Sequence, residues 1–299
     1  MKTQATTLPP GAHTTAALDP QEPPGPFTIS RCRLSTGITV EYVAQGAEAG
    51  HPVILLHGIT DSWRSFEPLL PHLPPGIRAY AVSLRGHGGS DRPDTGYAMR
   101  DMAADVVAFM DAMHIDTATL VGHSMGARVA MRAAIDRPER IRALVQLGAF
   151  APGLPNPSLD ELKAAVDVLA AGDVPAFARE FQEGTIARPV APGFVDTMIG
   201  ESMRLPTATW RAALDGFLAD DASRELAGLN LPVLLVWGTK DAFVTRLDQD
   251  TLCAGCPRPR LEVHEGAGHA LHWEAPARVA GDLMAFIGSA ADTQQDGPG

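Results

Sequence analysis

The chain has 299 residues, of which 45% are hydrophobic and 20% charged, a composition typical of globular proteins and unlike that of disordered or fibrous ones. It contains no run of about 18 apolar residues, which excludes a helix of membrane-spanning length. Its 24 basic and 35 acidic residues give a net charge of −11, which repels nucleic acids and anionic membranes, so we expect neither as a partner.

The two ends of the chain lack apolar runs. Residues 1–26 contain six prolines and no signal-peptide core, so we expect a flexible N-terminal tail. Residues 289–299 are polar and are expected to form a flexible C-terminal tail. Three cysteines are too few for a disulfide scaffold and leave one thiol over, so we expect a cytoplasmic protein.

From residue 27 onward, short apolar runs alternate with longer amphipathic segments, the pattern of βα units around a mostly parallel sheet. The predicted class is therefore α/β, with a mostly parallel central sheet and helices on both faces. The expected strands are residues 28–34, 38–44, 53–57, 79–84, 119–123, 143–147, 231–237 and 260–264. The expected helices are residues 63–73, 99–113, 124–136 and 276–287.

Residues 152–229 interrupt this alternation. They contain no strand-like run and predict helices, including 159–169, 174–182 and 207–218. Because this insertion lies between two parallel strands, it should emerge at one end of the sheet and cover a site there. We therefore expect a helical cap at 152–229, inserted between two parts of one core, residues 27–151 and 230–288.

A nucleophile motif occupies residues 122–126, with the sequence Gly-His-Ser-Met-Gly. It follows a predicted strand and precedes a predicted helix, which is the context that a nucleophile elbow requires. The glycines at 122 and 126 permit a tight turn that projects the hydroxyl of Ser124 from its apex. The pattern predicts Ser124 as a catalytic nucleophile.

A serine hydroxyl needs a base to take its proton and a third group to orient that base. Asp241 directly follows the buried strand 231–237, and His269 lies in a glycine-rich loop after the last strand. The order serine, aspartate, histidine is that of one hydrolase architecture. Four other aspartates, Asp220, Asp221, Asp248 and Asp250, are weaker candidates because they do not directly follow a buried strand.

The oxyanion that forms during acyl transfer also needs hydrogen-bond donors. The backbone N–H of Met125, at the start of the helix after Ser124, is one expected donor. The N–H of Ile59, in the loop after His57-Gly58, is the second.

Together these motifs resemble the α/β-hydrolase family, with matches from about residue 53 to 286. The motifs are His57-Gly58, RGHGGSDRP at 85–93, GHSMG at 122–126, GTKD at 238–241 and GAGH at 266–269. The resemblance implies that Ser124 is the nucleophile, Asp241 the acid, His269 the base, and Ile59 with Met125 the oxyanion hole. It also implies that 152–229 is the cap and that no cofactor is needed.

Departures from subfamily patterns narrow the expected reaction. Ser124 stands where the similar epoxide hydrolases and haloalkane dehalogenases have aspartate. Thr60 replaces the proline usual in cofactor-free haloperoxidases and perhydrolases, and His123 replaces the asparagine typical of carbon–carbon hydrolases.

We therefore expect a serine hydrolase that cleaves a carboxylic ester of a small to medium, largely apolar substrate through an acyl-enzyme. Lactone, amide or C–C cleavage, perhydrolysis, and a non-catalytic ligand-binding protein on the same fold remain alternatives. Trp210 and Phe181 are the candidate substrate-binding residues of the cap. Cys253 and Cys256 lack the second ligand pair of a zinc site, so no metal is expected. The sequence does not indicate an oligomeric state.

Overall fold

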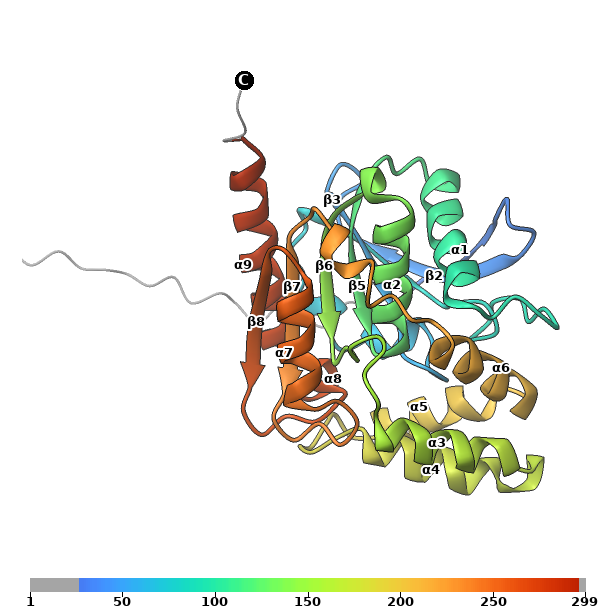
Figure 1. The fold of residues 1–299 in the computed structure, drawn as a ribbon. Coiled ribbons are helices and arrows are strands. Elements are labelled where there is room, and N and C mark those ends of the chain that lie inside the picture. The colour runs from blue at the N-terminus through green and yellow to red at the C-terminus, as the bar shows by residue number, and fades with distance from the viewer. Residues whose placement is uncertain (1–26, 296–299) are drawn as a thin grey trace, which may run out of the picture.

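A computed structural model describes residues 27–295, and its centre is an eight-stranded sheet (Figure 1). The strands follow the order β1-β2-β4-β3-β5-β6-β7-β8. β1 and β2 pair antiparallel, and β2 pairs antiparallel with β4, whereas every pair from β4 to β8 is parallel. The strands are β1 (Ile29–Arg33), β2 (Thr39–Gln45), β3 (His51–Leu56), β4 (Ile77–Val82), β5 (Ala118–His123), β6 (Ile141–Leu147), β7 (Val233–Gly238) and β8 (Pro259–His264). The predicted α/β class is confirmed.

Helices cover both faces of the sheet because side chains alternate along each strand. Ile54 and Leu56 of β3 pack in one buried cluster with α1 (Met99–Ala112) and α2 (Met125–Asp136). Val53 and Leu55, which point the opposite way, pack in a second cluster with α9 (Pro276–Gln295). The remaining core elements are η1 (Trp63–Phe66), η2 (Leu70–His72), η3 (Pro138–Arg140), η5 (Leu226–Gly228), α7 (Arg246–Gly255) and α8 (Leu271–Glu274).

Two predicted segments were wrong. Residues 63–73 form two short 3₁₀ helices, η1 and η2, where one helix was expected, because Pro68 and Pro71 lack the N–H groups that a continuous helix requires. The chain from residue 289 was expected to be a flexible tail, but α9 continues to Gln295. The predictions for residues 1–26 and 296–299 lie outside the described residues.

Four α-helices lie between β6 and β7, at the end of the sheet to which the parallel strands point (Figure 1). They are α3 (Pro157–Val168), α4 (Val174–Gly184), α5 (Phe194–Met203) and α6 (Thr207–Leu218), with the short η4 (Ala171–Asp173) between α3 and α4. α5 was not among the predicted helices, because Gly200 and its β-branched residues weaken its helical pattern. We call α3–α6 the cap.

Buried arginines of α2 hold the segments where the chain enters and leaves the cap. Arg128 donates to the carbonyl of Phe150, at 3.3 Å, and to the carbonyl of Asp220. Arg132 forms an ion pair with the Asp220 carboxylate at 2.9 Å. Both ends of the cap are therefore fixed to the helix that follows Ser124. Within residues 27–295, no helix combines the length and apolar character needed to span a membrane.

Candidate active site

Ser124 lies at the apex of a sharp turn between β5 and α2. Its backbone has φ 54° and ψ −116°, a conformation that is strained for any residue with a side chain. A Cβ at position 122 would clash with the backbone of Gly126 and Ala127, and one at position 126 with the carbonyl oxygens of Leu56 and His57. The turn therefore requires both glycines. The Ser124 N–H donates to Leu147 O of β6 at 3.0 Å, which fixes the strained residue to the neighbouring strand.

Asp241 and His269 lie in the loops after β7 and β8, which are neighbouring parallel strands. His269 Nδ1 is 2.9 Å from Asp241 Oδ2, and both side chains are almost fully buried. The other oxygen of Asp241 accepts the N–H groups of Phe243 and Val244, each at 2.8 Å. These bonds fix the carboxylate so that it accepts the Nδ1 proton, which leaves Nε2 of a neutral His269 as the basic nitrogen.

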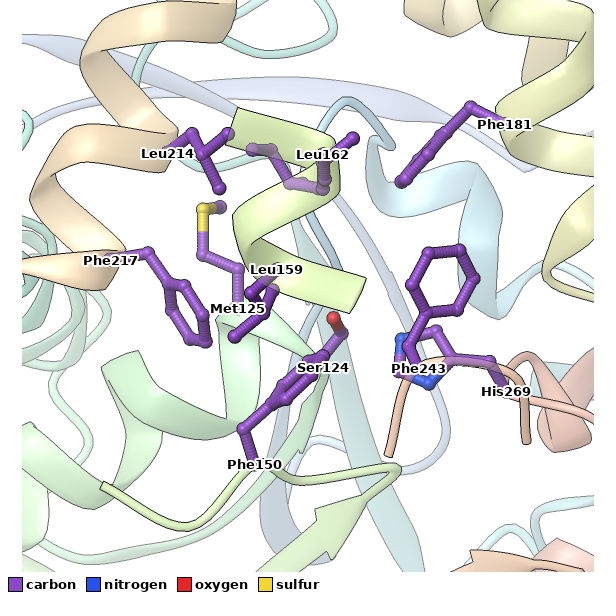
Figure 2. Close-up of a pocket in the computed structure, with 11 residues that line it drawn as sticks. Ser124, Met125, Phe150, Leu159, Leu162, Phe181, Leu214, Phe217, Phe243 and His269 are labelled. Atoms are coloured by element: carbon purple, nitrogen blue, oxygen red, sulfur yellow. The ribbon is translucent and has the colours of Figure 1, made fainter. Parts of the chain in front are cut away.

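The Ser124 hydroxyl and the His269 ring line the same cavity (Figure 2). Among the described residues the hydroxyl has no hydrogen-bond partner, and such catalytic contacts commonly tighten only when substrate binds. The arrangement brings together a hydroxyl, an imidazole and its carboxylate partner, which are the groups that the predicted roles of Ser124, His269 and Asp241 require.

The predicted oxyanion donors are the backbone N–H groups of Ile59 and Met125. Both residues line the cavity, and within the described chain neither N–H has an acceptor. Gly58 permits the close approach of this loop, because a Cβ there would lie 2.9 Å from His123 Nδ1 and 3.4 Å from Ser124 Cβ. His57 holds the loop in place, since its Nδ1–H donates to Gly58 O at 2.7 Å and its Nε2 accepts the Leu84 N–H at 2.9 Å.

Two further histidines, His123 and His272, lie next to His269. His123 Nε2 lies 3.2 Å from the His269 carbonyl, and its ring packs against His269 and His272. Burial lowers the pKa of His123 well below its usual value and lowers that of His272 to about 3. Both are therefore neutral at physiological pH and hold the His269 loop without adding charge next to the base.

The empty space within the cavity, including open solvent at its mouth, is about 350 Å³. Ser124 and His269 are the polar residues among its eleven lining residues (Figure 2). The other nine are apolar: Ile59, Met125, Phe150, Leu159, Leu162, Phe181, Leu214, Phe217 and Phe243.

Of the two predicted substrate-binding residues, one lines this cavity and one does not. Phe181 of α4 faces it (Figure 2). The prediction for Trp210 was wrong: its side chain is fully buried within the cap, its rings are edge-on to Phe177 and Phe181, and its Nε1 donates to Ser202 O at 3.3 Å. Trp210 therefore forms part of the cap core.

Most of the apolar residues that line the cavity were not predicted from the sequence. Phe150 and Phe243 follow β6 and β7 in the loops at the active-site edge, so their position after a predicted strand was an available signal. Leu159 and Leu162 of α3 carried no such signal.

The alternative aspartates have structural roles or lie on the surface. Asp220 pairs with the arginines of α2, and Asp248 is a buried part of the N-terminal cap of α7 that also accepts the Ala151 N–H at 3.0 Å. Asp221 and Asp250 are exposed. Cys253 belongs to α7 and Cys256 directly follows it, and no group of three potential metal ligands occurs in the part of the chain described.

Comparison with known proteins identifies the family. The family model described as alpha/beta hydrolase fold matches residues 51–276. The chain is 29% identical to a 2-hydroxymuconate semialdehyde hydrolase of Pseudomonas sp. (strain CF600), over 88% of this chain and 96% of the relative. It is 31% identical to a non-heme chloroperoxidase of Streptomyces lividans, over 85% and 98%. The structure of an esterase from Exiguobacterium antarcticum superposes with a TM-score of 0.78 at 22% identity, over 86% and 98%.

The chain therefore belongs to the alpha/beta hydrolase fold family, as the motif resemblance predicted. The likeness to the esterase structure shows the fold.

Proposed function

We propose that the protein is a serine hydrolase that cleaves carboxylic esters of small to medium apolar acids through an acyl-enzyme. Ser124 Oγ attacks the ester carbonyl carbon while His269 Nε2 takes the hydroxyl proton, and Asp241 holds the imidazole in the required tautomer. The N–H groups of Ile59 and Met125 stabilise the tetrahedral oxyanion.

Collapse of this intermediate breaks the bond to the alcohol, which leaves with the proton from His269. A water molecule then attacks the acyl-Ser124 carbonyl, again with His269 as base, and releases the acid. The same groups serve both halves of the reaction, so no cofactor is required.

The apolar lining of the cavity is the observation that supports an apolar ester. An ionised substrate group buried there would lose its hydration without gaining a cation, because no lysine or arginine is among the eleven lining residues. A neutral ester with an apolar acyl chain has no such cost. Burial of the chain contributes about 0.8 kcal/mol per CH₂ group.

The test is a panel of p-nitrophenyl esters of increasing acyl length, with lactones and one amide as competing substrates. We expect the highest kcat/KM for medium acyl chains, no turnover by Ser124→Ala, and a fluorophosphonate label on Ser124 by mass spectrometry. Preferred cleavage of the lactones or the amide would replace the ester assignment. Binding without turnover of any substrate, with no label on Ser124, would indicate a ligand-binding protein.

A cytoplasmic location is part of the proposal. The supporting observation is that the chain has three cysteines, so at least one thiol stays unpaired, which suits a reducing compartment.

A further inference from the structure

Thr60, the residue after Ile59, has an unusual backbone conformation. Its φ is 67°, in the left-handed region that β-branched residues rarely occupy. The Asp61 N–H donates to Gly58 O at 3.3 Å, so residues 58–61 form a turn with the positive φ at its third position. Turns of this type usually have glycine or asparagine there. Threonine needs other contacts to hold this conformation.

Those contacts come from the cap. The hydroxyl of Thr60 is 2.9 Å from the hydroxyl of Ser202 on α5, and both side chains are fully buried. Ser202 donates its own proton to Met198 O at 3.1 Å, so it accepts from Thr60. The strained residue is thus fixed to a cap helix.

Gln182 of α4 completes the connection. Its Nε2 donates to Ser202 Oγ at 2.8 Å and to Asp61 Oδ1 at 2.9 Å, and it too is fully buried. An amide has two N–H donors, and both are used in these bonds. Gln182 therefore links two cap helices to the residue on the far side of Thr60.

The core holds Asp61 from the other side. The Ser65 hydroxyl lies 3.0 Å from Asp61 Oδ2, from His272 Nε2 and from Trp273 Nε1. The turn at 58–61 is consequently fixed between the cap and the core, with Ile59 at its second position.

We propose that Gln182 and Ser202 are positioning residues: by holding Thr60 and Asp61, they make the oxyanion hole at Ile59 depend on the seated cap. This inference rests on the proposed function of Ser124 and Ile59. Without the two cap contacts, Thr60 relaxes to a negative φ and the turn at 58–61 loses its fixed geometry, which shifts Ile59 and with it the N–H of the Gly58–Ile59 peptide. The attack of Ser124 on the ester then slows even for a substrate too small to contact the cap residues that line the cavity.

The test uses Gln182→Leu and Ser202→Ala, each assayed on p-nitrophenyl acetate and with a fluorophosphonate. We expect kcat to fall about tenfold or more, since one lost oxyanion donor costs 10²–10³-fold and here the donor is displaced, not removed. KM should change less than about threefold, and labelling of Ser124 should slow in parallel with kcat. Two variants are used so that a folding failure of one leaves the other informative.

Gln249→Leu is the matched control. Gln249 is a fully buried glutamine that donates to one backbone carbonyl, Ala149 O at 2.9 Å, and its Oε1 has no partner within the described residues, as is also true of Gln182. Among the described residues it makes no hydrogen bond with the turn at 58–61. We expect this variant to lose stability but to keep its kcat.

A second-site variant separates positioning from a general structural effect. Glycine adopts a positive φ without strain, so Thr60→Gly should keep the turn without help from the cap. In that background, the kcat loss caused by Gln182→Leu should shrink from about tenfold to less than about threefold, a non-additivity that a merely structural role would not produce.

Wild-type kcat in folded Gln182→Leu and Ser202→Ala, or an undiminished loss in the Thr60→Gly background, would overturn the inference and leave the assignment of Ser124 intact. Absence of label on Ser124 in the wild-type protein would instead overturn the proposed function, and this inference with it.

Discussion

Replacement of Asp61 by asparagine should make the protein more stable at neutral and alkaline pH. Asp61 is 2% exposed, and burial raises the pKa of its carboxyl from 3.8 to about 7, against the opposing effects of hydrogen bonds from Gln182 and Ser65 and of nearby His269. Glu201, the other nearby acid, acts in the same direction as burial. Asparagine keeps an acceptor for Gln182 and offers an N–H to the Ser65 hydroxyl, so the substitution fits the same contacts.

The expected size follows from linkage. A raised carboxyl pKa means that the folded state binds the proton more tightly than the unfolded state. The cost of ionisation is therefore absent below about pH 4, grows as the pH rises to about 7, and is constant above that. Three pKa units at 1.36 kcal/mol each correspond to about 4 kcal/mol. The stability of Asp61→Asn relative to wild type should increase by that order across this window.

Urea unfolding at intervals from about pH 4 to pH 8 measures this difference. Asp250→Asn is the control, because Asp250 is exposed and the comparison isolates the effect of burial at Asp61. Parallel stability curves for wild type and Asp61→Asn would refute the reasoning, because they would mean that Asp61 titrates alike in the folded and unfolded protein.

Other substitutions test the remaining roles. Asp241→Asn should lower kcat by about 10⁴-fold with the fold intact, because the wrong imidazole tautomer then faces Ser124, and Asp250→Asn should be silent in the same assay. Phe181→Ala should shift the preferred p-nitrophenyl ester to a longer acyl chain, because it enlarges the cavity. Trp210→Ala should instead destabilise the protein by about 3–5 kcal/mol, as measured by urea unfolding, because it empties the cap core.

Local patterns made much of the fold predictable. Most of the parallel strands are short apolar runs bounded by turn residues, and the amphipathic spacing in α1 and α2 reports the face that packs on the sheet. The loops that carry Asp241 and His269 follow β7 and β8, which are adjacent and parallel, so the sequence order already placed these residues at one edge. The 2.9 Å contact between them required the structure.

The wall of the cavity could not be predicted in the same way. An aromatic residue at helical spacing looks the same whether it faces a core or a pocket. Trp210 and Phe217 both belong to α6, yet Trp210 is buried inside the cap while Phe217 lines the cavity. Which side of α6 faces the sheet depends on how the cap helices pack together, and no local pattern encodes that packing.

The two residues with strained backbones beside the cavity, Ser124 and Thr60, also differ in whether local sequence or tertiary structure accounts for their conformation. Ser124 and Thr60 both have positive φ, and each is adjacent in sequence to one of the two proposed oxyanion donors, the N–H groups of Met125 and Ile59. The strain at Ser124 is accommodated by glycines two residues away on either side, so the sequence reveals it. The strain at Thr60 is held by Ser202, 142 residues further along the chain. If the cap contact holds that strain, half of the oxyanion hole depends on tertiary structure that only the folded cap supplies.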